Sequence, residues 1–418
     1  MKIPDNNLWS DNTPSRFWLC QPELPQEVWD EAIKRALPVL GLQGEVADIN
    51  SVLELTLGEG RFGSNRYQLG FTRRSYYLLK PLLPRALTRL LRHLHNATKE
   101  NDRNLYWPVD PRFAQFQWET LRQGLLLAGR NEILWNRFWP EDKKFGFVLT
   151  HDVETAEGQR LIPNLANLEE SLGFRSSFNF VPERYPIDHG LMEDLRRRGF
   201  EIGVHGLNHD GKDFNSSKSF EQRSKRINEY LKEFQAVGFR SPLTHRNPAW
   251  MQMLVFEYDL SFFDTDPYEP MPGGVMSIWP FTIGHFLELP YTLPQDYTLF
   301  NVMGETSPRI WFEKIDFLER YHGMALVNVH PDYSGIGKSY SIFEAFLQGM
   351  KAHEGSWNAL PRDVASWWRR RASAGSINGS DNRSLATAFL RNGELVLEVD
   401  SPVKGVGNSS APVSKPIP

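Results

Sequence analysis

The sequence predicts an α/β fold in which parallel strands and crossover helices form a distorted, closed or nearly closed (β/α) barrel. Short apolar runs alternate with helical segments from residue 143 onward, beginning with the run GFVLT. The helical segments, such as SFEQRSKRINEYLKEFQAVG, repeat apolar residues every three or four positions. Strands that alternate with helices in this way build parallel sheets covered by helices.

The chain divides into an N-terminal accessory region (1–142), the barrel (143–371) and a tail (372–418). The first region contains a predicted helix, PQEVWDEAIKRALPVL, whose acids lie early, where the helix dipole favours negative charge. The tail is rich in Ser, Gly, Asn and Pro, apart from two short apolar runs that would pair as a hairpin.

A basic segment covers residues 73–95 of the accessory region. It has six Lys or Arg, no acid, and leucines at helical spacing that are interrupted by Pro81 and Pro84. Because the two prolines break a continuous amphipathic face, we expect the segment to pack internally with a solvated basic side. The alternative is contact with anionic lipid at a membrane surface.

Composition narrows the classes of function. A formal net charge of −4 gives no overall attraction to nucleic acid. The single cysteine, Cys20, excludes an internal disulfide framework and any multi-cysteine zinc motif, so a metal would be held by histidine and carboxylate. The N-terminus has no apolar core typical of a secretory signal, and we expect a cytoplasmic protein.

Polar side chains follow four of the apolar runs. The run GFVLT leads into His151, Asp152 and Glu154, and FEIGVH is followed by GLNHDG, which places His205 and His209 four residues apart. Because ligands collect at the carboxyl ends of strands in β/α folds, we expect these side chains to share one rim. Two histidines at this spacing can bind one ion if a helical turn begins there.

The other two runs end in single candidates. Arg240 follows GF, and His330 ends the run MALVNV. Taken alone, each candidate has an ordinary structural explanation, such as a helix cap, a loop histidine or a core ion pair. The recurrence of polar groups at the ends of successive strand-like runs favours a functional site.

The order of these motifs resembles that of the polysaccharide deacetylase superfamily, also described as NodB-homology proteins or family-four carbohydrate esterases. THDVE resembles the family's first motif, HGLNH the second, FRSP the third and VNVH the last. The fourth motif, an aspartate near a tryptophan, has only a loose counterpart in SFFDTDPYEPMPGG, which contains Asp264 and Asp266. The resemblance covers residues 143–370.

The resemblance implies a role for each matched residue. Glu154, His205 and His209 would hold a divalent metal, with zinc favoured. Asp152 would be the general base and Arg240 its partner, while His330 would protonate the departing amine.

The first motif departs from the family pattern. The family has two adjacent aspartates, whereas Val153 separates Asp152 from Glu154 here. We align Asp152 with the base and Glu154 with the ligand, and the reverse assignment remains open. His151 stands at an aromatic position of the motif and has no predicted role.

The implied activity is metal-dependent hydrolysis of the N-acetyl group of an amino sugar, in a glycan or a glycan precursor. One alternative is an amidohydrolase of small non-sugar amides. A second is a catalytically lapsed glycan-binding scaffold, which the altered first motif would explain.

Overall fold

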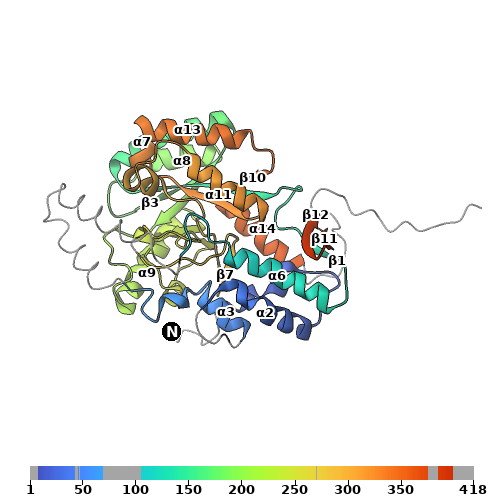
Figure 1. Ribbon diagram of the computed structural model, residues 1–418. Coiled ribbons are helices and arrows are strands. Elements are labelled where there is room, and N and C mark those ends of the chain that lie inside the picture. Colours follow the sequence, from blue (N-terminus) through green and yellow to red (C-terminus); the bar gives the residue numbers. More distant parts are fainter. Residues whose placement is uncertain are drawn as a thin grey trace, which may run out of the picture.

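A computed structural model describes residues 8–42, 46, 48–68, 105–269, 271–374 and 385–398 of the chain (Figure 1). The basic segment at 73–95 lies outside the described residues, so its predicted internal packing stays a prediction. Among the described residues, no helix is both long and apolar enough to cross a membrane.

The central element is a curved sheet of parallel strands, which confirms the predicted fold class. Strand β2 is buried along its whole length and has β9 on one edge and β3 on the other. From β3 the sheet continues in parallel through β4, β5, β6 and β8. The parallel strands are β2 (Phe145–Val153), β3 (Ser176–Phe180), β4 (Glu201–His205), β5 (Gly238–Arg240), β6 (Tyr258–Asp259), β8 (Phe286–Glu288) and β9 (Met324–Asn328).

An irregular segment brings the two ends of the sheet together. The chain leaving β8 makes a parallel bridge from Tyr291 to Phe263. The backbone N–H groups of Thr292 and Leu293 then donate to the carbonyl of Leu326 in β9, at 3.1 and 3.0 Å. The barrel is therefore nearly closed. Strand β7 (Phe281–Ile283) pairs antiparallel with β8, and β10 (Ser356–Asn358) pairs parallel with the start of β2.

Helices follow the strands, and one of them covers most of the segment SFEQRSKRINEYLKEFQAVG, whose apolar spacing predicts a helix. Each of the first three has a side-chain cap at its start, as in α7, where the Thr155 hydroxyl accepts a hydrogen bond from the N–H of Gly158. The helices of this region are α7 (Ala156–Leu172), α8 (His189–Arg197), α9 (Ser217–Glu233), α10 (Pro248–Met251), α11 (Arg309–Arg320), α12 (Pro331–Ser334), α13 (Gly337–Lys351) and α14 (Pro361–Ala374).

The accessory region packs directly on the barrel and shares its core. Its elements are α1 (Pro14–Trp18), α2 (Gln26–Leu40), α3 (Ile49–Leu55), α6 (Arg112–Leu127) and β1 (Glu132–Asn136), and α2, α3 and α6 lie together at one side of the molecule in Figure 1. Aromatic rings join it to the barrel, because the partly buried Phe17 and Trp118 both contact the buried Trp279. A buried ion pair between Glu59 and Arg246 adds a polar connection.

Part of the tail returns to the accessory region. Strands β11 (Leu385–Arg391) and β12 (Glu394–Glu398) pair as an antiparallel hairpin, and β11 also pairs with β1. The hairpin therefore joins a three-stranded sheet whose first strand comes from before the barrel. Its partner in sequence is some 250 residues away, so the hairpin's position depends on the folded barrel between them.

Candidate metal and catalytic site

The carboxyl ends of the parallel strands bring the predicted site residues to one rim. The structure places all six within a single cluster of close contacts: Asp152, Glu154, His205, His209, Arg240 and His330. They come from β2 and the residue after it, β4 and the loop that follows it, β5, and the N-cap position of α12.

Three of these residues form a candidate metal site. Ligand atoms of Glu154, His205 and His209 all lie within 4.8 Å of one another. His209 Nε2 lies 2.9 Å from Glu154 Oε1. Burial raises the pKa of Glu154, but the neighbouring histidines outweigh it and lower that pKa to about 2, so the carboxyl is a carboxylate.

His205 is oriented as a metal ligand would be. Its Nδ1–H donates to the backbone carbonyl of Arg240 at 3.1 Å, which leaves the lone pair on Nε2. That Nε2 is buried and has no hydrogen-bond partner among the described residues. Two imidazoles and one carboxylate match the ligand set of zinc hydrolases, which keep further coordination positions open.

The two histidines converge without the helical turn that their spacing suggested. Residues 206–211 form a loop, in which His209 has a φ of 52° and Gly206 a φ of 63°. A Cβ at Gly206 would lie 2.4 Å from the Pro242 ring, so glycine permits the close approach of the β4 and β5 loops. The rings of His205 and His209 are 5.2 Å apart, centroid to centroid.

Asp152 lies beside this cluster but has different partners. Its Oδ1 accepts hydrogen bonds from Asn179 at 3.0 Å and Arg240 at 3.2 Å, and its Oδ2 accepts one from Asn328 at 2.8 Å. Burial raises its pKa, yet the Arg240 guanidinium and nearby histidines hold the pKa well below the usual range. Oδ2 also lies 3.8 Å from His205 Nε2.

Arg240 is fixed by further hydrogen bonds. Its Nε donates to the carbonyl of Leu260 at 2.8 Å, and Nη1 donates to the hydroxyl of Thr150 at 3.0 Å as well as to Asp152. Since the guanidinium is 97% buried and cannot rotate freely, it holds Asp152 in one orientation.

His330 forms a second acid–base pair beside Glu154. Its Nδ1 lies 2.7 Å from Asp296 Oδ1, and its backbone N–H donates to Asp296 Oδ2 at 2.9 Å. Burial lowers its pKa, but the Asp296 carboxylate more than compensates and raises the pKa to about 10. His330 Nε2 faces Glu154 at 3.8 Å.

The sequence motifs do not single out Asp296, and they offer Asp264 and Asp266 as the loose counterpart of the fourth motif. Asp264 instead forms a buried ion pair with Lys314 at 2.8 Å, and Asp266 accepts a hydrogen bond from the N–H of Tyr268. Asp296 lies in the stretch PYTLPQDYTLF, whose first residues close the barrel. The sequence around Asp296 has neither a nearby tryptophan nor a motif spacing that would identify this aspartate as a site residue.

His151 has a structural position. Its Nδ1–H donates to the carbonyl of Val329 at 2.8 Å, and Nε2 lies 2.6 Å from Glu169 of α7. The ring stacks on Phe178 at 4.6 Å and 23°. It therefore fills an aromatic position between the sheet and α7 and faces away from Asp152, as alternation along a strand requires.

The sequence matches no known protein-family profile, and no curated protein matches it. Solved structures do align with the chain. One, described as a polysaccharide deacetylase from Mycobacterium smegmatis, is 19% identical over 58% of this chain and 95% of its own, with a TM-score of 0.45. Another, described as a polysaccharide deacetylase from Pseudomonas aeruginosa, is 18% identical over 56% of this chain and 94% of its own, with a TM-score of 0.46.

A third aligned structure is described as an allantoinase, with 15% identity over 56% of this chain and 93% of its own and a TM-score of 0.46. The alignments extend over little more than half of this chain.

Proposed function

We propose that this protein is a metal-dependent hydrolase of the polysaccharide deacetylase superfamily that removes the N-acetyl group from an amino sugar. One observation carries the proposal. Two buried pairs, Asp152–Arg240 and His330–Asp296, lie against the same cluster of Glu154, His205 and His209. Asp152 Oδ2 is 3.8 Å from His205 Nε2, and His330 Nε2 is 3.8 Å from Glu154 Oε1. A base, an acid and a set of metal ligands thus share one rim.

Asp152 is the base in this proposal. Its lowered pKa keeps it ionised at neutral pH, and the three hydrogen bonds from Asn179, Arg240 and Asn328 fix its orientation. It would accept a proton from the attacking water. Because a carboxylate held so firmly is a weak base in isolation, its effectiveness depends on a water whose own pKa is lowered.

The ligand cluster supports that requirement. Glu154, His205 and His209 would hold the ion, and a divalent ion bound there would polarise the acetyl carbonyl and lower the pKa of water. Zinc suits two imidazoles and a carboxylate, and we favour it on that ground.

His330 is the acid. Its raised pKa keeps the imidazolium protonated at neutral pH, with Nδ1 directed at Asp296 and Nε2 on the side of the ligand cluster, 3.8 Å from Glu154, where it would donate to a leaving group. Protonation is needed because an amine cannot leave an amide as its anion. The two pKa shifts run in opposite directions, which is the usual basis for assigning acid and base.

We infer from the substrate classes of this superfamily that the substrate is an N-acetylated sugar of a glycan or glycan precursor, and we propose a cytoplasmic site of action. The amidohydrolase and lapsed-scaffold alternatives make different predictions in one assay. Purified protein with added zinc is incubated with a panel of N-acetyl sugars and simple amides, and released acetate or ammonia is measured.

Acetate release from N-acetyl sugars that is abolished in Asp152→Asn supports the proposal. Turnover of simple amides alone would favour the amidohydrolase. Absence of turnover on the whole panel, with metal bound, would favour the scaffold.

A further inference from the structure

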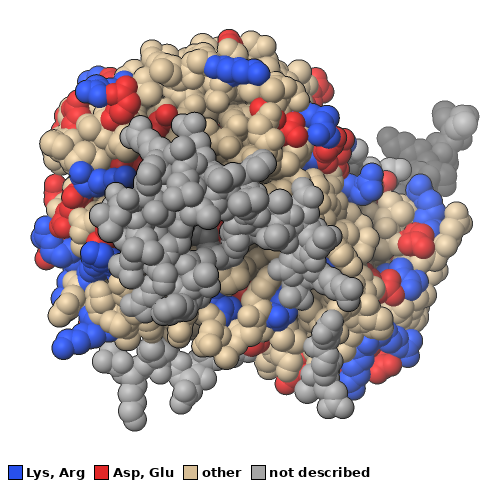
Figure 2. All heavy atoms as spheres, turned by 60° about the vertical axis from the view of Figure 1, so that its left-hand side comes forward, with Lys and Arg blue, Asp and Glu red and all other residues tan. Residues whose placement is uncertain are grey.

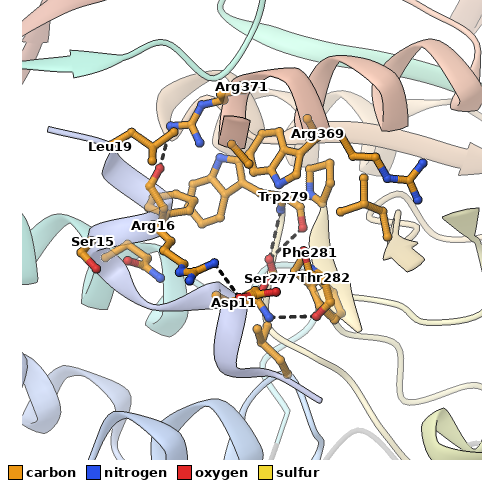
Figure 3. A pocket seen from close by; sticks show the side chains of 18 of the residues that line it. Asp11, Ser15, Arg16, Leu19, Ser277, Trp279, Phe281, Thr282, Arg369 and Arg371 are labelled. Carbon is orange, nitrogen blue, oxygen red and sulfur yellow. Dashed lines mark hydrogen bonds and ion pairs between the residues drawn. The ribbon is translucent and has the colours of Figure 1, made fainter. Parts of the chain in front are cut away.

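A cavity of about 540 Å³ lies away from the strand-end rim, between the accessory region, the β7–β8 hairpin and α14 (Figure 3). None of its lining residues belongs to the candidate metal and catalytic site. Its volume is within the range of small-molecule sites, which are concave and carry a few convergent polar groups in apolar walls.

Arg371 of α14 brings a buried positive charge to this cavity. The residue is only 5% exposed, and among the described residues no carboxylate forms an ion pair with it. Its Nε donates to the carbonyl of Arg137 at 2.9 Å, and Nη2 donates to those of Phe17 and Asn136 at 2.6 and 2.8 Å. Burial lowers the pKa of Arg371 to about 9, which leaves it charged at neutral pH.

These three bonds use Nε and Nη2 alone. Nη1 has no acceptor among the described residues, although the side chain lines the cavity. An arginine held in this way presents a fixed pair of N–H donors without a counter-charge. A carboxylate oxygen can accept from Nη1 in a single charge-assisted hydrogen bond, and buried arginine without an anion is uncommon.

Gln117 of α6 brings a second unsatisfied polar group to the same cavity. The residue is 1% exposed, and its Oε1 is buried without a hydrogen-bond partner. No hydrogen bond of its carboxamide to any described residue is present. Leaving a buried amide unpaired is unfavourable, so a group in the cavity that donates a hydrogen bond would stabilise this arrangement.

The remaining walls mix aromatic rings with polar side chains, which include the carboxylates of Asp11, paired with Arg16, and Glu23. Trp279 and Phe281 come from the β7 side, Phe17 from α1 and Trp368 from α14, as Figure 3 shows for the two labelled rings Trp279 and Phe281. Arg371 itself lies 5.1 Å from the centroid of the Trp368 ring. Flat apolar surfaces of this kind pack well against a compact ring.

We propose that this cavity binds a ring-shaped ligand that carries a carboxylate and a neighbouring hydroxyl group, the chemistry of an acidic sugar. The carboxylate would pair with Arg371, a hydroxyl would donate to Gln117 Oε1, and the apolar face of the ring would pack on the aromatic walls. This second site is independent of the proposed hydrolysis, because it shares no residue with the strand-end rim.

Glucuronate is the probe for the first experiment, with glucose and benzoate as comparisons, and isothermal titration calorimetry as the readout. Glucuronate should bind, whereas glucose lacks the carboxylate and benzoate lacks the hydroxyl, and each should bind at least about fivefold more weakly. Absence of glucuronate binding, or equal binding of glucose, would overturn the proposal.

Two pairs of variants place the binding in this cavity. Gln117→Leu should weaken glucuronate binding about fivefold without lowering the melting temperature, since it removes an unpaired buried amide, while the exposed Gln115→Leu on the same helix should bind normally. Arg371→Gln should weaken binding about 10- to 100-fold, and the exposed Arg370→Gln should not.

Arg371 also ties α14 to three backbone carbonyls, so its replacement could affect folding. Arg371→Lys retains the charge and should keep part of the affinity, and Gln117→Leu tests the site without touching these bonds. If glucuronate binds Gln117→Leu and Arg371→Lys as tightly as the parent protein, the ligand lies elsewhere and the proposal is wrong.

Discussion

At the scale of single residues, Asp152 and Glu154 show how two carboxylates on one strand end acquire different chemistry. Side chains two positions apart share a face, so both reach the rim. Asp152 receives hydrogen bonds from an arginine and two asparagines, whereas Glu154 lies among histidines. The hydrogen-bond donors around Asp152 hold it in one orientation, as a general base requires. The imidazoles beside Glu154 can share a metal ion with its carboxylate.

The first prediction separates these two roles. Asp152→Asn should retain the metal and lose about 100- to 10,000-fold in rate, because an amide cannot accept the proton of water at neutral pH. Glu154→Ala and His205→Ala should lose metal and activity together. Metal content by elemental analysis and acetate release are measured side by side. A metal-free Asp152→Asn with a loaded Glu154→Ala would exchange the two assignments.

The second prediction concerns Asp296. Replacing it with asparagine removes the carboxylate that raises the pKa of His330, so burial should bring that pKa down and leave the imidazole neutral near pH 8. The rate should fall about 10- to 100-fold, with its alkaline limb moved to lower pH and the metal retained. The exposed Asp316→Asn is the control. An unchanged pH–rate profile would show that Asp296 does not act through His330.

At the scale of elements, the neighbouring short strands β3 and β4 help to position Asp152, the proposed base. Asn179 of β3 donates to Asp152, and Gly203 lies beside it on β4 in the parallel register. A Cβ at Gly203 would be only 2.1 Å from Asn179 Oδ1, so the strand pair leaves room for that amide only because glycine is present.

The third prediction follows from this contact. Gly203→Ala should displace the Asn179 amide and weaken its hydrogen bond to Asp152, and we expect roughly tenfold slower hydrolysis in a protein that still folds. Gly190→Ala, in α8, is the matched control, since its Cβ would meet nothing closer than 3.3 Å. If both variants retain full activity, Asn179 has no part in holding the base.

At the scale of the whole molecule, buried charges connect regions distant in sequence. Glu59 of the accessory region pairs with Arg246 after β5, both side chains are fully buried, and Glu59 Oε1 also accepts the N–H of Gly274 at 2.7 Å. Arg246 stacks on Phe262 and Phe263 within 4.9 Å. Replacing one partner of such a pair with a neutral residue leaves the charge of the other partner uncompensated in the core.

The fourth prediction tests this connection. Glu59→Gln should lower the free energy of unfolding by about 3 to 5 kcal/mol, as measured by denaturant titration. The exposed pair of Glu31 and Arg35 provides the control, and Glu31→Gln should change stability by less than about 0.5 kcal/mol. An effect of Glu59→Gln no larger than that of the control would show that the accessory region is not stabilised through this pair.

The fifth prediction concerns stability against pH. Burial raises the pKa of Glu201, at the start of β4, to about 7, above its unfolded value near 4.5. The native state therefore holds a proton that the unfolded chain releases between these values, and stability falls as pH rises through that window. Glu201→Gln should remove this loss, on the order of 2 kcal/mol.

Thermal or denaturant unfolding at pH 5 and pH 8 measures the difference. The Tyr258 hydroxyl, which donates to Glu201 at 2.9 Å, can turn to accept from the new amide, so the variant should fold. Parallel pH profiles for the parent protein and Glu201→Gln would contradict the assignment.

The class of fold and the rim on which polar residues gather could both be predicted from the amino-acid sequence. The apolar period distinguishes buried strands from covering helices, and parallel strands place their carboxyl ends together, so motifs far apart along the chain were expected to meet. His205 and Arg240, for example, are direct neighbours in the register of β4 and β5.

Three features depend on contacts between distant segments and could not be predicted from the sequence: the aspartate that lies against His330, the amides that hold Asp152, and the pairing of the C-terminal hairpin with β1. Asp296, Asn179 and Asn328 act through contacts whose partners lie 27 to 176 residues away, in part on irregular backbone without any period. Loops carry no local signal of where they will pack, because their position depends on the elements that they join. Asp264 and Asp296 are therefore equally good candidates for the fourth motif in the sequence. They are distinguished only in the folded protein, where Asp264 pairs with Lys314 and Asp296 pairs with His330.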